Sequence, residues 1–140
     1  MAYSFRDIYR PLRLLLRFNG ALLGGLCGLL LLFAPVSRLA RWGVVTADPG
    51  WTSRLAGALL IALGVYFVLV AGRTTLDTTV LITSLIAHSL IALVVLSAYL
   101  QRDLTNLIWP GRIMLIGIVI LCLAGALLPL RYLRAEYRAY

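Results

Sequence analysis

The chain has 140 residues, of which 62% are hydrophobic and only 13% are charged, and its mean hydropathy is +0.97. Because about half of the residues in a soluble domain are apolar, so short and apolar a chain cannot hide its hydrophobic surface within itself. These values exclude an ordinary soluble domain and favour an integral membrane protein whose main solvent is the lipid bilayer.

The net charge is +8, and all thirteen basic residues are arginine. The arginines lie between the apolar runs, where basic residues set membrane orientation, and they form no continuous nucleic-acid-binding face. We therefore expect no nucleic-acid partner. The absence of lysine indicates a bacterial genome of biased base composition.

Four apolar runs follow one another along the chain, at residues 14–33, 55–71, 80–100 and 113–130. Each has about the 20 residues that an α-helix needs to cross a hydrocarbon core of roughly 30 Å. Strand-type alternation is absent, which excludes a β-barrel. The sequence therefore predicts one all-α domain over residues 1–140, an integral membrane four-helix bundle in the inner (plasma) membrane.

Prolines mark the expected helix boundaries. Pro11, Pro49 and Pro110 are placed to open the first, second and fourth helices, because proline suits the first helical turn. Pro35 and Pro129 fall near the ends of the first and fourth runs, where a helix can stop or kink.

The first run contains "NGALLGGLCG", which spaces Gly20, Gly24 and Gly28 four residues apart in a doubled GxxxG pattern. Glycine lets two helix backbones approach closely, and such packing drives helix association in lipid. Further helix surfaces that a neighbouring backbone can approach closely are expected at Gly57 and Gly64 in the second helix and at Gly117 and Gly125 in the fourth. The partner helix is either in this chain, which we favour, or in another chain. Asn19, at the start of the run, is expected to bond to a neighbouring helix.

The first loop, residues 34–54, is the longest connection, and its residues 36–42 have the pattern of a short amphipathic segment on the membrane surface. All three tryptophans, Trp42, Trp51 and Trp109, lie in the first and third loops. Tryptophan favours membrane interfaces, so these residues are predicted interfacial anchors.

Arginine counts predict the orientation. Eight arginines lie at the termini and in the second loop, and five lie in the first and third loops. By the positive-inside rule, both termini are expected on the cytoplasmic side.

The third run holds the only histidine, His88, within "SLIAHSLIAL". It lies near the centre of its span, where an ionised ring is costly, so a neutral ring is expected. Ser84 and Ala92 lie one turn before and after it on the same helix face. The favoured interpretation is a neutral histidine that forms a hydrogen bond across the bundle. The candidate partners are Ser84, one turn back on the same helix, and a backbone carbonyl that would accept on a facing helix.

Two other interpretations of His88 stay open. In one, His88 is a single ligand to a haem or other pigment. A second axial ligand would have to be another histidine, which the chain lacks, or Met114, which lies near the end of its span. In the other, His88 is a polar group that binds a quinone or lipid. A proton relay would need buried carboxylates, and no acidic residue lies near a span centre.

Catalytic patterns are missing: the chain has no Walker loop, GxSxG, HExxH or paired carboxylates. Cys27 and Cys122 lie deep in separate apolar runs without metal-site spacing, which is typical of inert buried thiols. The sequence therefore predicts neither an enzyme nor a metal site.

The stretch "GLLLLFAPVSRLARWG" and the following "RLAGALLIALGVYFVLVAG" resemble the small bacterial four-helix membrane proteins of the DoxX-like type. Arg54, Gly57 and Gly64 carry this resemblance, which covers the first half of the chain. It implies a four-helix bundle and no particular activity.

Three functions follow as hypotheses. The first is a non-enzymatic accessory or assembly subunit that packs against other membrane proteins. The second is a binding module for a pigment, quinone or lipid that uses His88, Ser84 and Ala92. The third is a small-molecule carrier, for which the sequence offers only scattered polar residues.

Overall fold

The computed structural model describes residues 9–45, 50–73, 76–102 and 104–137, and every regular element in these ranges is a helix. The elements in chain order are α1 (Arg10–Asn19), the π-helix η1 (Gly20–Gly28), α2 (Leu29–Phe33), α3 (Val36–Arg41), α4 (Trp51–Ala71), α5 (Thr78–Leu100) and α6 (Trp109–Tyr137).

Among the described residues, four helical segments are long and apolar enough to cross a membrane: Arg10–Phe33, which combines α1, η1 and α2, then Trp51–Ala71, Thr78–Leu100 and Trp109–Arg134. The predictions of an all-α chain and of four membrane-length helices are therefore confirmed. Each helix begins two to four residues before its apolar run, because interfacial residues occupy the first turn. Pro11 and Pro110 both stand in such a first turn, whereas Pro49 lies outside the described residues.

The two remaining prolines differ in their effect. Pro35 separates α2 from α3, as expected for a residue that ends a helix. Pro129 does not end the fourth helix, because α6 continues through it to Tyr137. Its side chain is fully buried, and membrane helices tolerate proline where neighbouring groups compensate for the missing hydrogen bond.

The middle of the first span is the nine-residue π-helix η1, where the sequence predicts an ordinary α-helix. π-helical hydrogen bonds run from residue i to residue i+5, so the backbone is wider than in an α-helix. Four of the nine residues of η1 are glycine, the residue least committed to α-helical backbone geometry. The local sequence therefore opposes this distortion less than a leucine-rich segment would.

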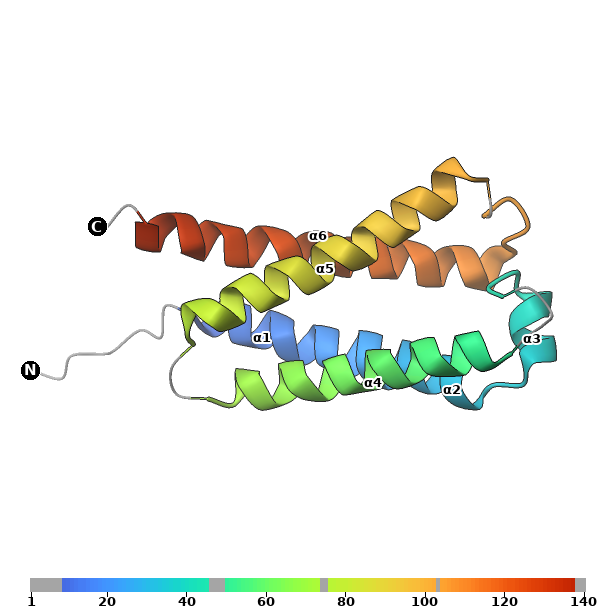
Figure 1. Ribbon diagram of the computed structural model, residues 1–140, viewed down its shortest axis with the longest axis horizontal. Coiled ribbons are helices and arrows are strands. Elements are labelled where there is room, and N and C mark those ends of the chain that lie inside the picture. Colours follow the sequence, from blue (N-terminus) through green and yellow to red (C-terminus); the bar gives the residue numbers. More distant parts are fainter. Residues whose placement is uncertain (1–8, 46–49, 74–75, 103, 138–140) are drawn as a thin grey trace, which may run out of the picture.

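The helices form two antiparallel pairs, the first span with α4 and α5 with α6 (Figure 1). Tyr9 and Tyr132, near the two ends of the described chain, are in ring contact with their centroids 5.1 Å apart. We call this end of the molecule the termini end. The opposite end, which carries α3 and residues 104–108, is the loop end.

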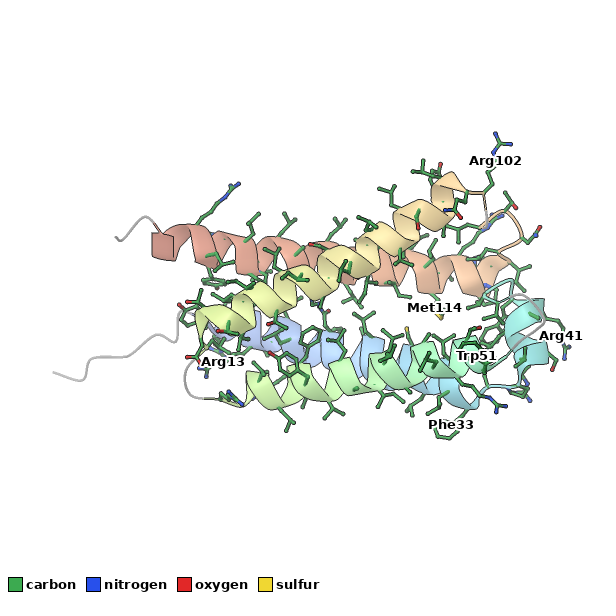
Figure 2. All side chains as sticks on the ribbon, viewed as in Figure 1. Arg13, Phe33, Arg41, Trp51, Arg102 and Met114 are labelled. Carbon is green, nitrogen blue, oxygen red and sulfur yellow. The ribbon has the colours of Figure 1, made fainter. Side chains whose placement is uncertain are left out.

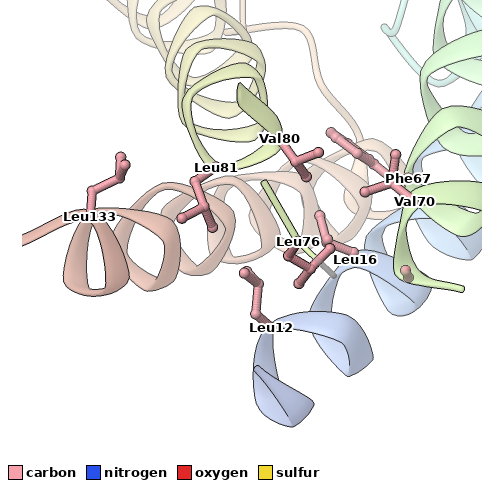
Figure 3. Close-up of a cluster of buried hydrophobic side chains, with 9 residues drawn as sticks. Leu12, Leu16, Phe67, Val70, Leu76, Val80, Leu81 and Leu133 are labelled. Carbon is pink, nitrogen blue, oxygen red and sulfur yellow. The ribbon is translucent and has the colours of Figure 1, made fainter. Parts of the chain in front are cut away.

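The main hydrophobic core lies toward the termini end, where both helix pairs meet (Figure 3). Its buried members come from α1, α4, α5, α6 and the turn before α5: Leu12, Leu16, Phe67, Val70, Ala71, Leu76, Val80, Leu81 and Leu133. This core joins the two pairs into one bundle.

Toward the loop end, α5 diverges from α4 while it crosses α6 (Figure 1). The buried residues of α5 are Val80, Leu81, Ser84 and His88, all in its first half. From residue 89 to residue 100, no residue of α5 is buried. The second half of α5 therefore presents a surface that the rest of the chain covers only in part.

The first and third loops touch at the loop end. The amide of Ile108 donates to the carbonyl of Trp42 at 3.3 Å. Gly43 has φ of +74°, and an added β-carbon would meet the Asn106 carbonyl carbon at 2.8 Å, so glycine is required there. Within α3, Leu39 is buried whereas Arg38 and Arg41 are exposed, which is the amphipathic pattern expected for this segment.

The three tryptophans lie at the loop end, as the start of α4 (Trp51), the start of α6 (Trp109) and the residue after α3 (Trp42). Trp51 and Trp109 are exposed, and Trp42 is half-buried. Their role as interfacial anchors stays a prediction.

Candidate functional site

His88, the eleventh residue of α5, lies at a point where all four membrane-length helices meet, and its side chain is fully buried. Its ring is surrounded by Asn19 from the end of α1, Phe67 from α4 and Gly125 from α6. We call His88 and these three residues, together with Ser84, the His88 node.

Both ring nitrogens of His88 have hydrogen-bond partners. Nδ1 lies 2.7 Å from the backbone carbonyl oxygen of Ser84, one turn earlier on α5, and 3.4 Å from the Ser84 hydroxyl. Nε2 lies 2.7 Å from the side-chain amide nitrogen of Asn19. Because a carbonyl only accepts and an amide NH₂ only donates, the contacts fit a neutral ring that donates from Nδ1 and accepts at Nε2.

Two further residues, Phe67 and Gly125, pack closely against the His88 ring. The Phe67 ring stacks on His88 with a centroid separation of 5.0 Å and an interplanar angle of 12°. A β-carbon added to Gly125 would lie 2.6 Å from Cγ of His88 and closer still to Cδ2 and Nε2. Glycine at position 125 therefore makes the room that the imidazole fills.

Asn19 connects three of the helices at this point. Besides its bond to His88, its amide nitrogen lies 3.4 Å from the carbonyl oxygen of Leu121 on α6. Its side-chain oxygen, Oδ1, is buried and has no hydrogen-bond partner among the described residues. An unpaired polar atom costs free energy in a membrane interior, so the node carries one uncompensated acceptor.

This geometry favours the hydrogen-bonding interpretation of His88. A metal or haem iron would bind a ring nitrogen, and here each nitrogen already has a protein partner. Ala92, the third residue of the predicted ligand face, is half-buried and is not part of the node. Within the described ranges, no three His, Cys, Asp or Glu side chains are grouped so as to hold a metal ion. The pigment and quinone interpretations stay predictions.

The glycine stripe of the first span faces α4 of the same chain. A β-carbon on Gly24 would lie 2.5 Å from Cα of Gly64, and one on Gly20 would lie 2.7 Å from the Gly64 carbonyl oxygen. Farther along, a β-carbon on Gly57 would meet the Gly28 carbonyl oxygen at 2.8 Å. The five predicted packing glycines thus lie in one contact between backbones, which side chains would push apart.

Sequence reasoning singled out His88, Ser84 and Asn19, but it did not join Asn19 to His88, and it missed Phe67. Asn19 does carry a signal of its own, since it is an amide at the start of an apolar run and must find a partner there. Phe67 carries no such signal, because aromatic residues are ordinary in membrane helices.

Comparison with models of protein families gave no match, and neither the curated proteins nor the solved structures contain a significant relative of this chain. The resemblance to DoxX-like proteins stays a prediction.

Proposed function

We propose that this chain is a non-enzymatic accessory or assembly subunit that packs against other membrane proteins in a bacterial inner membrane. The observation that supports this proposal most is the second half of α5. Over residues 89–100 it has no buried residue, although the first half of the same helix is held in the bundle core.

The end of this surface carries residue types that are common in protein–protein interfaces. A cleft of about 550 Å³ opens beside the C-terminus of α5 and is lined by Tyr99, Leu100, Arg102, Leu104 and Thr105. Tyr99 is 69% exposed, and the side chain of Arg102 projects outward from the tip of the helix (Figure 2). Tyrosine and arginine are enriched among residues that dominate the binding energy of protein interfaces.

The His88 node supports a packing role in a second way. Its polar side chains bind one another and join helices of the bundle, so these buried polar groups stabilise the fold and do not face a partner. A partner would therefore dock outside the bundle, and the diverging half of α5, which has no buried residue between 89 and 100, offers one such surface.

The orientation belongs to this proposal. With eight arginines on the side of the termini and the second loop against five on the other, the positive-inside rule places the termini in the cytoplasm. The cleft beside Tyr99 then faces the opposite, external side of the membrane. Fusion of a reporter that is active on only one side to either terminus tests this orientation directly.

Co-purification in a mild detergent tests the proposed function. We expect the tagged chain to retain a membrane protein in a fixed ratio. Replacing both Tyr99 and Arg102 by alanine removes two exposed contacts, and an interface hot spot contributes about 2 kcal/mol, or roughly 30-fold in affinity. The matched control is Trp109→Ala, which removes an exposed aromatic ring at the same end but outside the cleft.

A monodisperse single chain with no associated protein would contradict the proposal. So would a complex that survives the double substitution as well as it survives Trp109→Ala.

A further inference from the structure

A groove runs along the outer side of the η1–α4 contact, on a different face of the bundle from the cleft at α5. It consists of two adjoining hollows that share Gly25 and Leu29. The inner hollow, about 280 Å³, lies between η1 and α4 and reaches Gly20 and Val68. The outer hollow, about 710 Å³, continues along α2 to the loop end.

Small side chains leave open space along the groove. A β-carbon on Gly25 would meet nothing within 4 Å, whereas one on the adjacent Gly24 would collide with α4. Ala21, one turn before Gly25, also lines the outer hollow. The larger walls are apolar, among them Leu29 and Val68. The groove therefore suits a flexible hydrocarbon chain.

The outer hollow ends at a charge. Its lining passes from Phe33 through Pro35 to Arg38 on α3. The Arg38 side chain is exposed, and none of the described residues that line the two hollows is acidic. Phe33 is 74% exposed and points away from the bundle beside this opening (Figure 2). A cation thus stands at the mouth of an otherwise apolar groove, at the level where α3 lies across the loop end (Figure 1).

The length of the groove also fits one lipid leaflet. Gly20 and Phe33 are thirteen residues apart, which corresponds to about 15–20 Å along the helix axis. Half of a hydrocarbon core of roughly 30 Å is about 15 Å. An acyl chain that begins at the interface beside Phe33 therefore reaches the inner hollow near the bilayer centre.

We propose that this groove binds one anionic phospholipid, with an acyl chain over Gly25 and the phosphate at Arg38. An amphiphile with one charged end and one apolar tail matches the groove at both ends, whereas an apolar partner helix would supply no counter-charge to the guanidinium. Basic residues near the membrane surface attract anionic headgroups by about 1 kcal/mol each.

Native mass spectrometry of the detergent-solubilised protein tests this assignment, with phosphatidylglycerol and phosphatidylcholine of identical acyl chains as probes. We expect one phosphatidylglycerol to be retained about fivefold better than phosphatidylcholine. Arg38→Gln should abolish this preference, whereas Arg41→Gln removes an equal charge from the same helix outside the groove and should preserve it. Gly25→Leu should reduce retention of both lipids, because its side chain fills the groove.

The matched control for the filled groove is Gly117→Leu, since a β-carbon at Gly117 also meets nothing within 4 Å and the residue lies on α6. Equal retention of the two lipids by the unmodified protein would overturn the proposal, as would equal effects of the two arginine substitutions. If Gly25→Leu displaced a co-purifying protein and left lipid retention unchanged, the groove would belong to a partner helix and the assignment to a lipid would be wrong.

Discussion

Replacing Gly125 by alanine should destabilise the bundle, although alanine is the better helix former. The added methyl group would overlap the His88 ring, whose Cγ lies 2.6 Å from the position of the new carbon. The ring cannot turn aside freely, because Phe67 stacks on it and Asn19 and Ser84 hold its nitrogens. The clash must therefore be relieved by movement of α5 or α6, or by loss of the hydrogen bonds.

The magnitude follows from three contributions. Overpacking a well-filled site costs about 1–3 kcal/mol. A hydrogen bond between membrane helices contributes on average about 0.6 kcal/mol. Replacement of glycine by alanine in a helix interior stabilises the helix by about 1 kcal/mol, which offsets part of this loss. We expect a net loss of about 2 kcal/mol in the free energy of unfolding for Gly125→Ala.

The assay is reversible unfolding in mixed micelles, followed by helix content, with Gly117→Ala as the matched control. Gly117 lies two turns earlier on α6, and an added β-carbon there meets nothing within 4 Å, so alanine should be neutral or stabilising by up to about 1 kcal/mol. In a His88→Ala background, Gly125→Ala should lose its penalty, because the ring that it overlaps is gone. Equal stability of the two glycine variants would refute the packing of His88 against α6.

Three further predictions concern other parts of the fold. Gly24→Ala should cost more than about 2 kcal/mol because its β-carbon meets the backbone of α4, whereas Gly25→Ala, one residue later in open space, should be neutral in the same unfolding measurement. Asn19→Leu should lower the free energy of unfolding by about 1 kcal/mol, since it removes the donor to the histidine ring but also the unpaired Oδ1. A loss above about 3 kcal/mol would contradict this reasoning, because a single hydrogen bond does not account for it. Cys27 and Cys122 are 5% and 0% exposed, so a thiol reagent should label neither in the folded protein and both after unfolding. Rapid labelling of the folded chain would contradict their burial.

The apolar runs were sufficient to predict the four helices, because a segment of about 20 apolar residues in lipid must satisfy its backbone hydrogen bonds internally, and an α-helix does so. The starts of the first and fourth helices were also predictable, because Pro11 and Pro110 stand in their first turns. Trp51 and Trp109 begin α4 and α6 outside the apolar runs, since an interfacial turn requires no hydrophobic side chain. α6 also continues through the buried Pro129, where the sequence pattern leaves open whether a helix stops or kinks.

The candidate site was partly predictable for a similar reason. A polar side chain within an apolar run has to find a partner, so the sequence alone singles out His88 and Asn19. Their partnership depends on how α1 and α5 are rotated against each other, and helix periodicity alone does not determine this rotation. The π-helix η1 begins directly after Asn19 and adds a change of rotation that an α-helical pattern does not contain.

Cross-linking in native membranes tests most directly whether the second half of α5 contacts another protein. Leu93 on α5 and Leu59 on α4 are each 63% exposed, and they lie seven and eight residues from the loop end of their helices, which is about 11–12 Å along each axis. Because the two native cysteines are buried, Leu93→Cys and Leu59→Cys each create one reactive thiol at matched depth. A membrane-permeant cross-linker should join the first variant, and not the second, to a membrane protein in high yield. Equal yields at the two positions, or none at position 93, would contradict docking on α5.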